Sequence, residues 1–202
     1  MLNATTPGVI VILLVTAAVS LYGLYGRPKL IAASLFQPYY FLRSKQYYTL
    51  LSSGVVHASV SHLFFNMMTF YFFGPPLERV IGTVSFVILY VLALILSEAR
   101  TYIQHRDDPR YASLGASGAV SAVLFASIVY FPTQSIFILP IPIPLPAILF
   151  AVGYLVYSSY LARQGNDGVN HTAHIDGAIT GLLFVLVTNG DAYQRLFRIL
   201  GY

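Results

Sequence analysis

Long apolar runs separated by short polar segments dominate this chain. Of its 202 residues, 57% are hydrophobic and 9% are charged, whereas a soluble domain carries about 25% charged residues. A helix needs about 20 mostly apolar residues to cross a bilayer. We therefore expect an all-α membrane protein forming one integral domain over residues 1–202, a six-transmembrane-helix bundle with these spans: Pro7–Leu24, Val60–Arg79, Thr83–Ser97, Gly115–Phe131, Ile136–Leu161 and Thr172–Asn189.

Charge and cysteine content narrow the function classes. The net charge of +4 is spread over the loops, so there is no basic patch and we expect no nucleic-acid partner. The chain has no cysteine, which excludes disulfides, thiol catalysis and cysteine–zinc sites. The lipid bilayer is the partner that the composition requires.

The segments between the spans differ in character. Tyr25–Ser59 mixes basic and aromatic residues, which suits a first loop partly embedded in the membrane interface. We expect a short connector around Leu77-Glu78-Arg79, with Glu78 and Arg79 as an interfacial capping pair, and an aqueous loop over Glu98–Ser113. Prolines at alternate positions from Pro140 to Pro146 predict that the fifth span is helical only after Pro146.

The loop charges bear on orientation and location. If the N-terminus is cytoplasmic, Arg79, Arg195 and Arg198 lie inside and the other eight of the 11 Lys and Arg residues lie outside. The positive-inside rule alone therefore places the N-terminus outside. The short extramembrane segments favour a bacterial inner membrane.

Ser117 lies in Gly115-Ala-Ser117-Gly118, at the start of a short apolar run. A helix that begins there starts below the membrane surface, and its free N–H groups and dipole favour a developing oxyanion. A serine becomes nucleophilic when a neighbouring base accepts its proton. The same small residues are also typical of simple helix packing in membranes.

His174 is the candidate base. It heads the last span, and Gly177 and Gly181 share its helical face, so another helix can approach closely enough for an imidazole–hydroxyl contact. A histidine that only supports packing and a proton relay in a transporter are the alternatives.

A second polar pair, His62 and Asn66, lies one helical turn apart. Their N–H groups are candidate oxyanion donors beside the backbone N–H of Ser117. A metal site is the alternative, which the absence of nearby cysteine or carboxylate disfavours. His57, just upstream, is expected near the surface, either supporting the site residues from behind or simply solvated.

Asp176 is the carboxylate set well inside a span. Residues two apart on a helix point to nearly opposite sides, so we do not expect Asp176 to orient His174 in a triad. Protonation, or a bond to Thr180 or to another helix, would satisfy it instead.

Together these motifs resemble the rhomboid family of intramembrane serine proteases over nearly the whole chain. The resemblance lies in His62-x-x-x-Asn66, Gly115-Ala-Ser117-Gly118, Ala173-His174-x-x-Gly177-x-x-x-Gly181 and Gly74-x-x-x-Glu78-Arg79. It implies a Ser–His dyad with Ser117 as nucleophile and His174 as general base, and an oxyanion site of His62, Asn66, Ser117 and Gly115. It implies substrates that are single-span membrane proteins, and no metal or cofactor.

The chain departs from the family pattern at three places. Tyr48-Thr49 replaces a Trp-Arg pair in the first loop, Asp176 replaces an apolar or small residue, and Ser121 stands where a bulky residue often stacks on the histidine. Both dyad residues are retained, so we expect activity. The rival functions are an inactive rhomboid-like binder of transmembrane helices and a small proton-coupled transporter that uses His62, His174 and Asp176.

Overall fold

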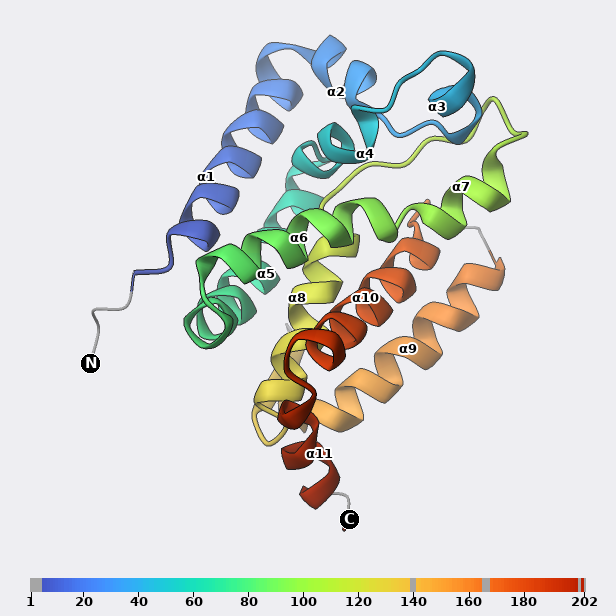
Figure 1. Cartoon of the computed structure of the whole chain (residues 1–202). Helices are drawn as coiled ribbons and strands as arrows, with labels where there is room; N and C mark the ends of the chain where they lie inside the picture. The colour runs from blue at the N-terminus through green and yellow to red at the C-terminus, as the bar shows by residue number, and fades with distance from the viewer. Residues whose placement is uncertain (1–4, 139–140, 165–167, 200, 202) are drawn as a thin grey trace.

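The computed structural model describes residues 5–138, 141–164, 168–199 and 201, which are mostly helical (Figure 1). Short turns of other helix types cover Tyr22–Gly26, Ser53–Val55 and Gly190–Ala192. The α-helices are α1 (Pro7–Leu21), α2 (Pro28–Ser34), α3 (Pro38–Arg43), α4 (Thr49–Ser52), α5 (Val60–Ile81), α6 (Thr83–Leu96), α7 (Ala99–His105), α8 (Ser117–Tyr130), α9 (Ala147–Gln164), α10 (His171–Asn189) and α11 (Tyr193–Ile199).

Each of the six expected spans contains a helix, but their lengths and compositions differ. Within the described residues, three helical stretches are long and apolar enough to cross a membrane: Pro7–Gly26, Thr83–His105 and His171–Ala192. The apolar helix α8 is shorter, and α5 and α9 do not combine the length and apolarity of those three. The chain is thus a helical membrane protein, while the count of six spans stays a prediction.

Helix α8 forms the centre of the molecule. Every residue from Gly118 to Tyr130 is buried, because α10, α5 and α6 all pack on it. A helix that is apolar on all sides is expected in such a central position. Figure 1 shows α8 in yellow behind α10, with α9 along the outer side of α10 and the blue helix α1 on the opposite flank beside α5 and α6.

The expectation that the protein is all-α is wrong in the fifth predicted span, which begins with two β-strands. Its first part is a two-stranded antiparallel hairpin of β1 (Ser135–Ile138) and β2 (Ile141–Pro146), in which Ser135 pairs with Pro146. Helix α9 begins at Ala147, so the prediction that the span turns helical after Pro146 is confirmed. Alternate prolines suit an edge strand, since they lack the N–H that a helix or an inner strand needs. Pro140 lies outside the described residues.

The connector expected around Leu77-Glu78-Arg79 is wrong, because α5 continues through Pro75 and Pro76 to Ile81. Glu78 is a capping residue, but it is buried rather than interfacial. Its buried carboxylate accepts the N–H groups of Gly8 and Val9, at 2.9 and 2.8 Å, and so closes the start of α1. Helix α1 has no side-chain cap of its own at Thr6, so α5 supplies one.

The first loop is not irregular, because it contains α2, α3 and α4 at one end of the molecule, beside α7 (Figure 1). Its backbone holds the segment that leads into α8. Phe36 and Ser113 exchange two N–H···O bonds of 3.0 Å in an isolated antiparallel bridge. This loop therefore holds the chain segment just before Ser117 in place, although the loop lies far from Ser117 in sequence.

Candidate active site

Ser117 is the first residue of α8, as the sequence predicts. Gly115, two residues before Ser117, has φ +114°, a backbone conformation that residues other than glycine rarely adopt. Two neighbouring amides hold this turn: Gly115 N–H donates to the carbonyl of Ser53 at 2.9 Å, and Ala116 N–H donates to His57 Nε2 at 3.4 Å. As the first helical residue, Ser117 has an N–H without a partner inside its own helix.

The His62 ring lies against Gly115. A Cβ added to Gly115 would come within 2.6 Å of His62 Cε1 and 2.9 Å of Nε2. Glycine is favoured at this position by its φ, and a Cβ would in addition force the His62 ring to move. The contact brings a predicted oxyanion donor to the turn that carries Ser117. The Gly115 amide is bonded to Ser53 in this structure, and Gly115 makes room for His62, while its role as an oxyanion donor stays a prediction.

Asn66, the other predicted donor, is buried on α5 one turn after His62. Its Nδ2 donates to the backbone carbonyl of His62 at 3.2 Å. An amide nitrogen carries two hydrogens, so a second donor remains for another acceptor. The two side chains share one face of α5, which confirms the predicted helical spacing.

His57 is completely buried, so the solvated alternative is wrong, and its contact with the turn before Ser117 agrees with the supporting role. Its Nε2 accepts from Ala116, its Nδ1 lies 2.9 Å from Ser20 Oγ, and that hydroxyl donates to the Val55 carbonyl at 2.9 Å. Since an amide can only donate, Nδ1 must carry the proton in this chain of bonds, and the ring is neutral. Burial, with a smaller effect of His62, lowers the pKa of His57 to about 3.

Helices α8 and α10 cross with their backbones in contact. A Cβ added to Gly177 would lie 2.0 Å from the Gly118 carbonyl oxygen, and one added to Gly181 would lie 2.2 Å from that of Ala122. A Cβ added to Gly118 would lie 3.3 Å from the carbonyl oxygen of Ala173. Gly118 follows Ser117 and Ala173 precedes His174, so the crossing places the two turns that carry Ser117 and His174 beside each other.

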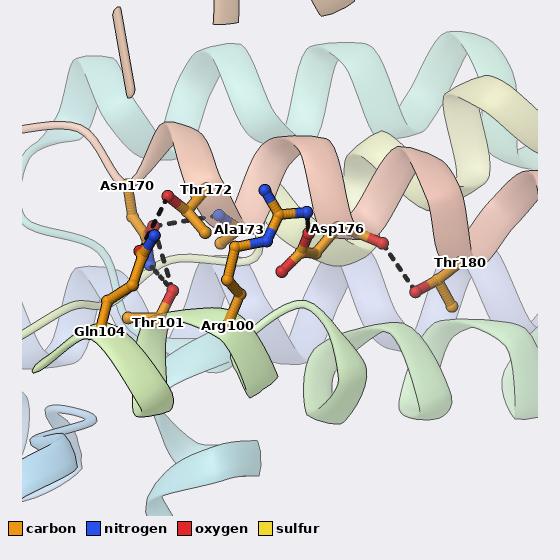
Figure 2. A network of polar contacts seen from close by, with 8 residues as sticks. All are labelled: Arg100, Thr101, Gln104, Asn170, Thr172, Ala173, Asp176 and Thr180. Atoms are coloured by element: carbon orange, nitrogen blue, oxygen red, sulfur yellow. Dashed lines mark hydrogen bonds and ion pairs between the residues drawn. The ribbon is translucent and has the colours of Figure 1, made fainter. Parts of the chain in front are cut away.

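The start of α10 is tied to α7 by polar side chains (Figure 2). Asn170 caps α10 by accepting the Ala173 N–H at 3.0 Å, and its Nδ2 donates to Thr101 at 3.0 Å and to Glu98 at 3.3 Å. The expectation that Glu98–Ser113 is wholly aqueous is therefore wrong at its beginning, because Glu98 is buried in this network. The network fixes the helical turn from which His174 projects.

Asp176 has a partner on another helix, as the sequence argument expects. Its carboxylate pairs with the guanidinium of Arg100 on α7, while Thr180 donates to its backbone carbonyl at 2.7 Å (Figure 2). The predicted bond to another helix is thus found in Arg100. The ion pair is a second tie between α7 and α10.

Tyr154 on α9 is a neighbour of the site that the sequence reasoning missed. Its ring stacks on His174, with ring centroids 6.3 Å apart and planes at 24°. Its hydroxyl lies 2.8 Å from Ser121 Oγ on α8. The available signal was the tyrosine itself, since a phenol inside an apolar helix needs a polar partner.

These groups amount to a hydroxyl at a helix N-terminus, a histidine on the adjoining helix and N–H donors on a third. They suit acyl transfer, in which a serine attacks a carbonyl and the resulting oxyanion is stabilised. Within residues 5–138, 141–164, 168–199 and 201, no three His, Cys, Asp or Glu side chains come together as a metal site. His57 lies beside His62, with ring centroids 4.9 Å apart, but both ring nitrogens of His57 already have partners.

Comparison with known proteins agrees with this chemistry. The model of the rhomboid domain matches residues 44–190. The chain is 28% identical over 151 residues to the mitochondrial RHOMBOID-like protein 12 of Arabidopsis thaliana, covering 67% of this chain and 45% of that protein. It is 29% identical over 140 residues to the candidate rhomboid protease YdcA of Bacillus subtilis, covering 68% and 65%.

A third relative matches a larger share of this chain. Over 188 residues the chain is 27% identical to the mitochondrial Rhomboid protein 1 of Saccharomyces cerevisiae, covering 89% of this chain and 53% of the yeast protein. The chain thus spans about half to two thirds of the length of these relatives. The rhomboid-domain match covers most of the chain and includes Ser117, His174, His62 and Asn66. The chain therefore belongs to the rhomboid family.

Proposed function

We propose that this protein is an intramembrane serine endopeptidase that cleaves single-span membrane proteins in or near their membrane segment. The observation that carries the proposal is the crossing of α8 and α10 at Gly118 and Gly177, beside Ser117 and His174. The rhomboid-domain match supports a protease or a rhomboid-like protein without activity. Both retained dyad residues favour the protease.

In the proposed reaction, Ser117 Oγ attacks the scissile carbonyl carbon while His174 accepts the hydroxyl proton. The negative charge on the carbonyl oxygen is stabilised by the Ser117 N–H and by the side chains of His62 and Asn66, near the positive end of the α8 dipole. His174 then donates its proton to the leaving amine, and an ester on Ser117 remains. Water, deprotonated by His174, hydrolyses that ester and frees the serine.

The substrate must expose its scissile carbonyl before attack. A membrane helix keeps that carbonyl in a backbone hydrogen bond, so cleavage requires local unwinding, which helix-breaking residues in the substrate favour. We propose entry beside α9, because α9 lies at the outer side of α10 and exposes Val152, Val156 and Tyr160 (Figure 1). The protease is proposed to form one integral domain of six spans that uses no metal or cofactor.

The apolar helices and the rhomboid domain indicate an integral membrane protein. Two of the relatives described above are named as mitochondrial, so the comparisons give no support to a bacterial inner membrane. The proposed activity does not depend on the compartment.

The test uses the purified chain in detergent with two reporters. One is a fluorogenic single-span substrate, and the other is a fluorophosphonate that labels an activated serine without needing a membrane helix to enter. Ser117→Ala and His174→Ala should each abolish cleavage and labelling. Ser127→Ala, at a buried serine on the same helix, and His105→Gln on α7 should leave both in place.

The rival functions predict different results. An inactive binder would show neither cleavage nor labelling of the folded wild type, and Ser117→Ala would not change its affinity for membrane helices. A proton-coupled transporter would lose its function in Asp176→Asn and keep it in Ser117→Ala. Either pattern would overturn the proposal.

A further inference from the structure

The inner face of α9 presents one aromatic side chain to the candidate dyad. Tyr154 stacks on His174 of α10, with centroids 6.3 Å apart and planes at 24°. Its ring also lies 5.6 Å from Phe125 of α8 and 5.8 Å from Phe150 of its own helix. Tyr154 is therefore packed between three helices, and one side of its ring faces the candidate base.

The hydroxyl of Tyr154 fixes where that ring can lie. It bonds to Ser121 Oγ at 2.8 Å, and Ser121 follows Ser117 by one turn of α8, on the same face. A path of contacts thus runs from the helix of the nucleophile through Ser121 and Tyr154 to the ring of the base. Because a phenol loses hydration inside an apolar helix bundle, this bond also helps to keep Tyr154 turned inward.

A serine–histidine pair depends on the orientation of the imidazole, which a third group commonly fixes. The carboxylate of Asp176, two residues from His174 in the chain, is paired with Arg100. A flat ring stacked on the imidazole restricts rotation of the imidazole about its last side-chain bond. Tyr154 has the geometry for this role, and it comes from a helix that carries neither dyad residue.

We propose that Tyr154 is the positioning residue for His174, and that docking of α9 through the Tyr154–Ser121 bond keeps the base aligned with Ser117. The inference rests on the proposed protease function. It implies that displacing α9 separates Tyr154 from both partners and so disorders the base. Tyr154 touches neither the substrate nor the proton in this role; it acts through His174.

The first measurement is the rate of fluorophosphonate labelling at Ser117. Tyr154→Leu removes the stacked ring and should slow labelling about tenfold or more, within the range that coupled neighbours show. Tyr154→Phe keeps the ring and loses the bond to Ser121, so it should slow labelling about threefold. Ser121→Ala should match Tyr154→Phe, and the double variant Tyr154→Phe/Ser121→Ala should be no slower than either.

The matched control is Tyr157→Leu, one turn along α9 at a side chain that is 63% exposed. It should label like the wild type. With the single-span substrate, Tyr154→Leu should lower kcat and leave KM nearly unchanged, since orientation of the base acts in the transition state. Circular dichroism melting of each variant shows whether it is folded.

A readout that needs no catalysis separates the two proposals. Diethyl pyrocarbonate modifies histidine rings, and mass spectrometry reports the rate at His174. Tyr154→Leu should raise that rate several-fold, and Tyr157→Leu should not. If the wild type labels at Ser117 and Tyr154→Leu labels equally fast, the positioning role is wrong and the protease stands. If the folded wild type neither labels nor cleaves, the proposed function fails and the positioning role fails with it.

Discussion

The carbonyl oxygen of Gly118 lies so close to Gly177 that a single added carbon on Gly177 would be 2.0 Å away from it. Real atoms do not approach so closely, so α8 and α10 can cross here only with glycine on α10. The contact is between two backbones, and neither side can yield by changing a rotamer. It fixes the distance between the turns that carry Ser117 and His174.

Gly177→Ala should therefore separate the two helices and damage both folding and the site. We expect a loss of at least about 1–3 kcal/mol in the free energy of unfolding, as for overpacked cores, and a large loss of Ser117 labelling. Gly153→Ala on α9 is the matched control, because nothing lies within 4 Å of its added Cβ. Thermal unfolding and Ser117 labelling of both variants in detergent check this. If Gly177→Ala unfolds at the same temperature and labels at the same rate as Gly153→Ala, the close crossing is wrong.

Glu78→Gln tests the cap that α5 provides to α1. The substitution keeps the shape of the side chain but leaves one oxygen for the N–H groups of Gly8 and Val9, and removes the charge that favours a helix start. We expect a loss of about 1–3 kcal/mol in unfolding free energy. Arg79→Gln, at the exposed next residue, should cost little. A Glu78→Gln variant as stable as Arg79→Gln would mean that the cap is unimportant.

His57 should make stability depend on pH. Its pKa in the folded protein, about 3, is below the ordinary value of 6.5, so between those values the unfolded chain binds a proton that the folded chain does not. Stability from this group is complete above pH 6.5 and falls as the pH drops toward 3, by up to about 1.4 kcal/mol per pH unit.

A melting series from pH 7 to pH 5 checks this expectation. His57→Gln, which does not titrate, should have a shallower fall than the wild type, although it is less stable at pH 7 because the link from Ala116 to Ser20 is disturbed. His105→Gln controls for the loss of a histidine elsewhere. If the two variants show the same dependence on pH, His57 is not the group responsible.

Asp176→Asn distinguishes a structural ion pair from a proton relay. If Asp176 only ties α10 to α7 through Arg100, its loss should cost about 1 kcal/mol or less, since the arginine is 45% exposed. Labelling of Ser117 should persist. Arg100→Gln should have a similar effect, and the double variant should be no worse than the sum of the two losses. Complete loss of labelling in Asp176→Asn alone would assign the carboxylate a role in the reaction.

Periodicity and composition were sufficient for the starts of the long helices. The expected starts at Pro7, Val60 and Thr83 are those observed, and α9 begins directly after Pro146. These starts depend on local chemistry: proline, capping residues and the length of each apolar run. For the same reason the sequence placed His62 and Asn66 on one face of α5, and disfavoured an Asp176–His174 contact.

The errors came from contacts between segments far apart in the chain. Nothing local indicates that His57 is enclosed by Ser20 and Ala116, or that Gly74-Pro-Pro stays helical while Glu78 caps α1. The β-hairpin was missed because its strands stabilise each other only once they are paired. Burial and pairing of this kind depend on the neighbour, which the local pattern does not contain.

For this protein, the sequence by itself determined the membrane class, the positions of most helices and the residue types able to perform serine chemistry. The tertiary structure decided which backbone crossing brings Ser117 and His174 to neighbouring turns, that Gly115 makes room for His62, and that Tyr154 reaches His174 from α9. The physical reason is the separation along the chain over which each kind of interaction acts. Hydrophobicity and helix start signals act within a few residues, whereas contacts such as Gly118–Gly177 and Tyr154–His174 exist only after whole helices have packed.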